Sequence, residues 1–479
     1  MIDKQEVMDF AHEFGIAPNT IEKDYVLGWI LAGISNHRHL GPTWVFKGGT
    51  CLKKCYFETF RFSEDLDFTL TESIYLSEQF LTVSFNEIAD WVYEAAGIEI
   101  PKDTIRFDIY KNTRGNLSAQ GRIGYRGPMR RRGDAPRVKL DLTNDEILVL
   151  NPALREVHHP YSDRPEDGIK TQCYCLEEVF AEKIRALAER ERPRDLYDVV
   201  HLYRHYESES DRALVMSTLR QKCMFKGIDV PTALILDKQP ERGELETEWE
   251  NMLGHQLPAL PPFQQFWQEL PAVFDWLHGI SEKVARPRIR TTAVQIDESW
   301  RPPAMAYAWH ASTPLEVIRF AAANHLCVEL AYQNTTRLIE PYSLRRTKDG
   351  NLLLCAVKRS TGEDRSYRVD RIQRAGVTKM PFVPRYLIEL TPAGPPLRIR
   401  DSTGLPSSMT SRAKTAQARP KGRTLSYGPK YRFRCPACGK QFTRSSFDAS
   451  LNPHKNKNGY PCPGGIGVYV GESRGYRSK

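Results

Sequence analysis

Residues 47–68 read KGGTCLKKCYFETFRFSEDLDF, in which a glycine pair, Gly48 and Gly49, precedes two alternating carboxylates, Asp65 and Asp67, by about one helix length. Because successive side chains of a strand face opposite ways, the two aspartates share one face and their apolar neighbours share the other. Side-by-side carboxylates repel one another, and a divalent metal ion relieves that repulsion. Glycines at the start of a helix let the backbone approach a phosphate closely. The stretch therefore predicts a phosphate-binding loop followed by a Mg²⁺-binding strand, as nucleotide transfer requires.

A third carboxylate occurs further along the chain. Residues 138–143 read VKLDLT, so Asp141 alternates with apolar residues and belongs to one face of a strand. Two interpretations stay open from the residues alone. Asp141 is either a third acid beside the pair or an exposed aspartate on an edge strand.

Residues 176–203 predict two helices. Apolar residues recur at helical spacing, and the pattern breaks at Pro193. Lys183 lies on the first helix, and Arg194-Asp195 opens the second, with Asp198 three residues further on. Taken alone, a lysine and an aspartate on helices are more typical of a solvated surface than of a site.

These motifs resemble the nucleotidyltransferases of the AbiEii/AbiGii toxin family, relatives of the DNA polymerase β superfamily. The matching segments are residues 47–50 (KGGT), residues 61–68 (RFSEDLDF) and the block that carries Lys183 and Asp195. The resemblance implies that Asp65 and Asp67 bind Mg²⁺, that a later strand adds a carboxylate at Asp141, that Lys183 contacts the triphosphate and that Asp195 belongs to the active site. It also implies an NTP-binding set: Lys47, Gly48, Gly49, Thr50 and Ser63.

Composition places the chain among globular proteins with several domains. The chain has 479 residues, of which 41% are hydrophobic and 10% aromatic. Residues 1–15 carry charges where a signal peptide would need an apolar run, so we expect a cytoplasmic protein with mostly reduced cysteines and no membrane span. We expect Cys51, Cys55, Cys173, Cys175, Cys223, Cys327 and Cys355 to be core thiols.

The positive charge is concentrated at the C-terminal end. Residues 401–479 hold 15 Lys and Arg against three acids, whereas the whole chain has a net charge of +9. A basic tail on a nearly neutral body is typical of nucleic-acid binding. A tail that only improves solubility is the alternative.

Changes in pattern divide the chain into six segments of an α+β protein. We expect a catalytic domain of polymerase β type at residues 1–205, with a core helix at 21–33 ahead of a strand at 44–46, and a helical extension at 206–280. A linker at 281–312 precedes a small β domain at 313–392. A flexible linker at 393–430 and a basic module at 431–479 complete the chain.

The β domain at 313–392 is predicted to be a small barrel. One short helix precedes strands at 327–333, 337–346, 352–358 and 365–372, with turns between them. The segment resembles the WYL domain, an Sm-like barrel, although the Trp-Tyr-Leu run itself is absent and Asn351-Leu352-Leu353-Leu354 stands near its place. The resemblance implies a ligand face that binds nucleic acid or nucleotides. Its candidates are Tyr332, Tyr342, Arg346, Arg368 and Arg371; a purely structural barrel is the alternative.

The basic module contains a candidate zinc site. Cys435 and Cys438 form a C-x2-C turn, and His454 and Cys462 follow. Four soft ligands suit tetrahedral Zn²⁺, and a segment this short needs a metal to fold. A redox pair is the alternative for a single C-x2-C motif, but no βαβ context surrounds it.

Together these features predict Mg²⁺-dependent transfer of a nucleoside monophosphate from an NTP to an acceptor. The resemblance suggests RNA, such as a tRNA 3′ end, as acceptor, and a toxin or phage-defence role with a separate antitoxin. Two rivals stay open. One is a regulator that senses nucleic acid through the barrel and the zinc module, and the other is transfer of the nucleotide to a protein.

Overall fold

The computed structural model describes residues 1–57, 60–112, 114–130, 133–205, 212–233, 242–282, 285–291, 295–299, 315–390, 430–444, 451–452, 454, 462 and 468–473. The chain forms two compact units, Met1–Arg400 and Asp401–Lys479. Most of the predicted flexible linker at 393–430 lies outside the described residues.

The larger unit is built on a seven-stranded mixed sheet with the order β3-β4-β5-β2-β1-β7-β6. β2 runs parallel to β5 and antiparallel to β1, and β1 runs parallel to β7. The strands are β1 (Trp44–Lys47), β2 (Asp65–Leu70), β3 (Arg106–Lys111), β4 (Leu117–Gly124), β5 (Arg137–Thr143), β6 (Ala153–Val157) and β7 (Ile169–Cys173). Because β2 and β5 are central, Asp141 does not lie on an edge strand.

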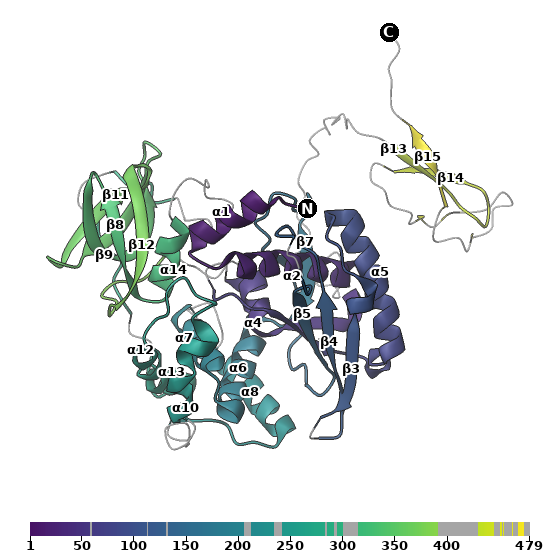
Figure 1. The fold of residues 1–479 in the computed structure, drawn as a ribbon, viewed down its shortest axis with the longest axis horizontal. Helices are drawn as coiled ribbons and strands as arrows, with labels where there is room; N and C mark the ends of the chain where they lie inside the picture. The colour runs from purple at the N-terminus through teal and green to yellow at the C-terminus, as the bar shows by residue number, and fades with distance from the viewer. Residues whose placement is uncertain are drawn as a thin grey trace, which may run out of the picture. The chain divides into compact units, whose positions relative to one another are not determined.

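Two long helices cover one face of this sheet. α2 (Pro18–Asn36) contacts β2 and β7, and α5 (Glu78–Ala96) contacts β3. Leu66 and Phe68 of β2 are fully buried, as their alternation with the aspartates predicts. The opposite face therefore carries the carboxylates, and Figure 1 shows α5 on one side of β3–β5 and the α6–α8 helices on the other. The predicted helix at 21–33 and strand at 44–46 are confirmed.

The helical part of this unit begins at α6 (Leu176–Arg190) and α7 (Pro193–His205). The predicted break falls at Pro193, which is the first residue of α7, a position where its missing N–H and fixed φ are tolerated. Further helices follow: α8 (Arg212–Lys226), α10 (Arg242–Thr247), α11 (Trp249–Leu253), α12 (Phe263–Trp267) and α13 (Leu270–Leu277). The remaining short elements are α1 (Lys4–Phe14), α3 (Leu40–Thr43), η2 (Ser73–Tyr75) and η3 (Lys102–Thr104).

The predicted small β domain is a five-stranded antiparallel sheet with the order β11-β10-β9-β8-β12. Its elements are α14 (Leu315–Ala323), β8 (Leu326–Tyr332), β9 (Thr335–Arg346), β10 (Leu352–Lys358), β11 (Glu363–Arg368), η5 (Val369–Arg371) and β12 (Ile372–Pro381). The sequence does not predict β12, which follows the last predicted strand and pairs with β8.

The β domain packs directly on neighbouring helices of the same unit. α14 contacts α7 and α1, and the Tyr197 hydroxyl of α7 donates a 2.8 Å hydrogen bond to Asn324 Oδ1. Part of the predicted linker also belongs to this domain, since the Asp297 amide donates to the Arg346 carbonyl and Ile289 is buried.

The C-terminal unit contains a three-stranded sheet, β14-β13-β15. Its strands are β13 (Lys430–Arg434), β14 (Gln441–Arg444) and β15 (Val468–Ser473). Among the described residues, no helix combines the length and the apolar character that crossing a bilayer requires.

Candidate active site and metal centre

The register between β2 and β5 brings three carboxylates together. Asp67 is paired with Asp141, and Asp65 is paired with Lys139, so all four side chains emerge from one face of adjacent strands. Burial raises the pKa of Asp67 most, and Asp141 and Asp65 raise it further, to about 6, against the opposing effect of Lys47 and Lys183. Burial likewise raises the pKa of Asp65. Such mutual repulsion is what a divalent cation between the carboxylates would relieve.

The glycine loop, residues 47–50, lies against this acidic pair. Gly48 has a φ of 78°, and a Cβ atom there would lie 2.1 Å from Asp67 Oδ2. Only glycine combines this backbone conformation with so close an approach. The Thr50 hydroxyl donates a 2.5 Å hydrogen bond to the Asp65 carbonyl oxygen, which ties the loop to the acidic strand. The loop continues into α4 (Gly48–Cys51) and the π-helical turn η1 (Leu52–Tyr56).

Ser63 and Arg61 approach the loop from the segment before β2. A Cβ atom on Gly49 would lie 2.5 Å from Arg61 Nη2 and 3.2 Å from Ser63 Oγ. The guanidinium of Arg61 is buried and donates two 2.8 Å hydrogen bonds to Asp198. The second glycine therefore leaves space for a buried ion pair that links this segment to α7.

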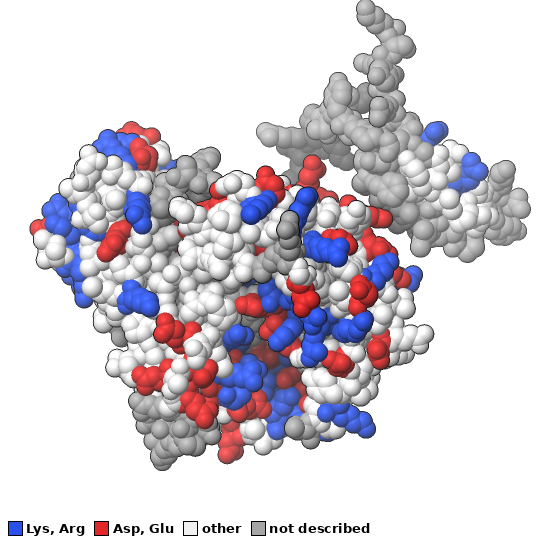
Figure 2. All heavy atoms as spheres, viewed as in Figure 1, with Lys and Arg blue, Asp and Glu red and all other residues white. Residues whose placement is uncertain are grey.

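A small cavity of about 110 Å³ opens beside the acids. It is lined by Lys47, Gly48, Asp67, Tyr174, Val179, Glu182, Lys183, Ala186 and Arg190. Figure 2 shows a hollow on this face with acidic side chains in its depth and Lys and Arg around its rim. The cavity thus joins three cationic side chains to one of the predicted metal ligands, which is the charge pattern that a phosphate with a bound cation requires.

Lys183 is held in place by two buried carboxylates. Its ammonium lies 3.1 Å from Asp195 Oδ1 and 2.7 Å from Asp198 Oδ2. Asp195 is fully buried, and Arg190 donates to both of its oxygens at 2.7 and 3.0 Å. Although burial raises the pKa of Asp195, Lys183 and Arg190 lower it well below its usual range. Asp195 is therefore ionised and engaged with cations, while Lys183 and Arg190 reach the cavity.

The structure adds site residues that the sequence reasoning missed. Glu182 pairs with Lys47 at 3.1 Å and with Lys222 at 3.4 Å, and Tyr174 and Arg190 line the same cavity. Glu182 directly precedes Lys183 in the sequence, so its place beside a predicted site residue could have identified it as a candidate. Tyr174 had no such signal, because only the pairing of β7 with β1 brings it to the glycine loop.

The five candidates in the β domain are divided by burial. Tyr332 accepts a 3.3 Å hydrogen bond from the Arg368 amide, Arg346 pairs with Asp297 at 2.6 Å, and Arg371 is exposed. Tyr342 instead is fully buried and packs edge-on against Phe382 and Tyr386. The expectation that Tyr342 belongs to a ligand-binding surface therefore does not fit its environment, because its ring is part of the core.

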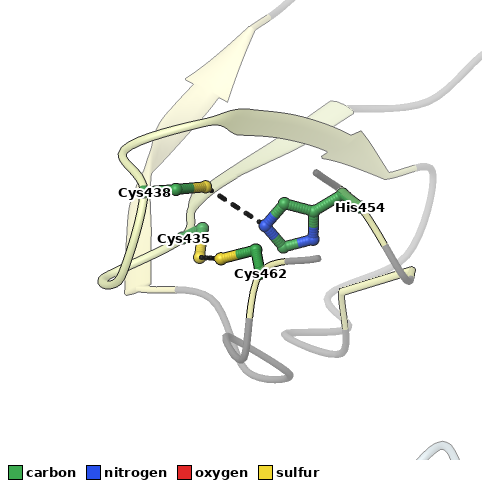
Figure 3. Close-up of side chains that lie close together, drawn as sticks. All are labelled: Cys435, Cys438, His454 and Cys462. Carbon is green, nitrogen blue, oxygen red and sulfur yellow. Dashed lines mark hydrogen bonds between the residues drawn. The ribbon is translucent and has the colours of Figure 1, made fainter. Parts of the chain in front are cut away.

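The four predicted zinc ligands of the C-terminal unit lie together. Their ligand atoms are within 4.8 Å of one another, and Figure 3 shows them pointing toward a common centre. Burial raises the pKa of Cys435, but backbone N–H groups of Cys438 and Ala437 lower it to about 6 overall, which favours the thiolate that binds a metal. His454 Nδ1 lies 2.9 Å from the Asn452 carbonyl, which leaves Nε2 as the ligand atom. The donor set fits a closed Cys3His zinc site.

We expect Asp67→Asn to change how stability depends on pH in the metal-free protein. An unfolded aspartate has a pKa of about 3.9, whereas Asp67 titrates at about 6 in the fold. Between these values the native state holds a proton that the unfolded state has lost, so stability falls as pH rises through this window. Asp67→Asn should therefore unfold at a higher temperature than the wild type at pH 7.5 and not at pH 4.

The matched control is Asp90→Asn, which removes an exposed carboxylate on α5. It should follow the wild-type pH profile. Identical pH profiles for the wild type and Asp67→Asn would contradict the account of a repulsive acidic cluster.

We expect Cys438→Ser to lose one equivalent of bound zinc relative to the wild type, because three ligands hold Zn²⁺ less tightly than four. Elemental analysis of the purified full-length chains measures this. Cys327→Ser, which removes a buried thiol of β8, should keep the wild-type content. Equal zinc content in Cys438→Ser and the wild type would overturn the assignment.

Comparisons with known proteins identify two families. Residues 29–276 match the family described as nucleotidyl transferase AbiEii toxin, type IV TA system, and residues 314–377 match the WYL domain. A search of curated proteins found no match.

Three solved structures are similar. MenT4, a nucleotidyltransferase toxin of Mycobacterium tuberculosis H37Rv, is 18% identical over 59% of this chain and 91% of its own, with a TM-score of 0.40. JHP933 of Helicobacter pylori is 17% identical over 55% of this chain and 94% of its own, with a TM-score of 0.36. A putative nucleotidyltransferase of H. pylori is 16% identical over 55% of this chain and 97% of its own, with a TM-score of 0.36. Because the family match spans more than half of the sequence, this chain belongs to the AbiEii family of nucleotidyltransferase toxins and carries a WYL domain.

Proposed function

We propose that this protein transfers a nucleoside monophosphate from an NTP to the 3′ hydroxyl of an RNA, with Mg²⁺, and releases pyrophosphate. The observation that carries the proposal is the register that places Asp67 beside Asp141, next to a glycine loop and a cavity lined by Lys183. Phosphoryl transfer needs a metal site, a backbone segment that can bind the phosphates and a cation for the leaving group.

Asp65 and Asp67 hold the metal ion in this proposal, and Asp141 adds a third carboxylate. The raised pKa of Asp67 supports the assignment, since the group is destabilised as an anion unless a cation joins it. A bound Mg²⁺ supplies charge neutralisation at the phosphates and the attacking oxygen.

Residues of the glycine loop receive the triphosphate. Gly48 and Gly49 let the loop lie close to Asp67 and Arg61, Thr50 fixes the loop on β2, and Ser63 lies beside Gly49. Lys47 and Lys183 neutralise the charge that develops on the departing pyrophosphate. Asp195 acts as a positioning residue, because both of its oxygens are already bound by Lys183 and Arg190.

The acceptor is proposed to follow a row of cations across the open sheet face. Strand register places Lys139 beside Asp65, Arg122 beside Lys139 and Arg106 beside Arg122. Neighbouring strands lie about 4.8 Å apart, so this row leads away from the metal site in steps of that length. All three side chains are exposed. A polyphosphate backbone such as RNA suits such a row, whereas a protein acceptor gains little from it.

The remaining modules have supporting roles in this proposal. The WYL domain binds a nucleotide or nucleic acid through Tyr332, Arg346, Arg368 and Arg371, and the C-terminal unit binds Zn²⁺ and contacts RNA. A separate antitoxin restrains the enzyme, as the type IV toxin family implies.

We expect Asp65→Asn and Asp67→Asn each to lower nucleotide transfer at least about 100-fold, because each removes a metal ligand. The assay incubates the full-length protein with each α-labelled NTP, Mg²⁺ and total RNA, with and without EDTA. Label should appear on RNA and disappear in the variants and with EDTA.

The control Asp90→Asn should transfer at the wild-type rate. If the label appears on protein and not on RNA, the acceptor is a protein and the proposed RNA acceptor is wrong. Tight nucleic-acid binding with no transfer of any NTP would favour the regulator instead and refute the enzyme mechanism.

We expect Arg106→Gln combined with Arg122→Gln to raise the KM for the RNA several-fold and to leave the KM for the NTP unchanged. Each lost phosphate contact should also reduce the slope of log K for RNA binding against log salt concentration by about one unit. Lys102→Gln, which removes an exposed lysine paired with Asp90, is the matched control. An unchanged salt slope in the double variant would show that the row does not contact the acceptor.

A further inference from the structure

Three buried thiols lie together behind the glycine loop. The sulfur atoms of Cys51, Cys55 and Cys173 all lie within 4.8 Å of one another, and the three residues are at most 6% exposed. Cys51 ends α4, Cys55 belongs to η1, and Cys173 ends β7. The sequence predicts each of them only as a core thiol. Their convergence from two distant segments makes them a cluster, which we call the thiol cluster.

The donor set of the thiol cluster selects a soft cation. It contains three sulfur atoms and no carboxylate, so it differs in kind from the oxygen ligands of Asp65 and Asp67. Sulfur atoms that share a Zn²⁺ ion at about 2.3 Å lie about 4 Å apart. The thiols therefore need to move by less than about 1 Å to become ligands.

The surroundings offset the charge that such a complex would carry. Zn²⁺ with three thiolates has a net charge of −1, and the buried Arg155 guanidinium lies beside the cluster. Arg155 Nε donates a 2.7 Å hydrogen bond to the Cys55 carbonyl, and its guanidinium lies 4.2 Å from the Tyr56 ring centroid. The Tyr56 hydroxyl, 3.9 Å from Cys173 Sγ, adds a polar oxygen beside the sulfur atoms.

We propose that Cys51, Cys55 and Cys173 form a binding site for a thiophilic d¹⁰ cation, Zn²⁺ or Cu⁺, distinct from the zinc site of the C-terminal unit. Binding exchanges three thiol protons for one cation, so no oxidant or reductant takes part. The proposal does not depend on the proposed transfer reaction.

Occupation of the thiol cluster would join two parts of the active-site cavity. Cys51 directly follows Thr50 of the glycine loop, and Cys173 directly precedes Tyr174, which lines the cavity. A cation held by both segments fixes the loop relative to β7 and α6. The bound ion therefore stabilises the nucleotide site from behind without contacting the nucleotide.

The test uses the full-length chain with Cys435→Ser and Cys438→Ser, which disable the C-terminal zinc site. Zn²⁺ and, in a separate anaerobic arm, Cu⁺ are titrated against a competing chelator, and Cd²⁺ reports thiolate coordination by its ultraviolet charge-transfer band. We expect one bound equivalent, a higher Tm on binding, and weaker binding at lower pH because protons are released. The arm with the tighter binding identifies the preferred cation.

Adding Cys173→Ser should weaken binding at least 10-fold and reduce the Cd²⁺ band, whereas adding Cys327→Ser should change neither. If Cys173→Ser does not fold, Cys55→Ser removes the most exposed of the three thiols and gives the same comparison. Failure of the parent to bind any of the three cations, or equal binding by the parent and the thiol variant, overturns the proposal.

Discussion

The burial of neighbouring carboxylates, Asp65 and Asp67 beside Asp141, is the constraint on which the rest of the site depends. The register of β2 and β5 places these carboxylates on one face, and burial strengthens their effect on one another. Lys47 and Lys183 offset part of this effect on Asp67. The cavity beside it presents Lys47, Lys183 and Arg190, and the proposed divalent ion would add a further positive charge next to the carboxylates.

A second ionic network fixes the positions of Lys183 and Arg190, which line the cavity. Among the described residues, Arg61, Lys183 and Arg190 form ion pairs with two carboxylates, Asp198 and Asp195. Buried ion pairs of this kind contribute little net stability because their desolvation is costly. Their use here is geometric: they fix α6 against α7 and hold Lys183 and Arg190 at the cavity.

Local patterns in the sequence predict much of the fold and of the site. The alternation in DLDF predicts which side chains face the core, and Pro193 marks the junction of α6 and α7. These features depend on periodicity and backbone restraint within a few residues, which a single sequence displays directly.

What depends on long-range pairing was not predictable from the residues alone. The partnership of Asp67 with Asp141 requires the register of two strands about 70 residues apart in the sequence, and only family resemblance indicated it. The burial of Tyr342 and the convergence of Cys51 with Cys173 likewise follow from packing. A tyrosine or cysteine in an alternating strand carries no signal of the partner that it meets across the core.

The proposed chemistry depends on the position of one divalent ion. A crystal structure of the full-length protein with Mn²⁺ and a non-hydrolysable NTP analogue, with Mn²⁺ located by anomalous scattering, tests it most directly. We expect Mn²⁺ to be bound by Asp65 and Asp67, with the triphosphate between Gly48 and Lys183. Manganese bound elsewhere, or a nucleotide bound only on the WYL domain, would contradict it.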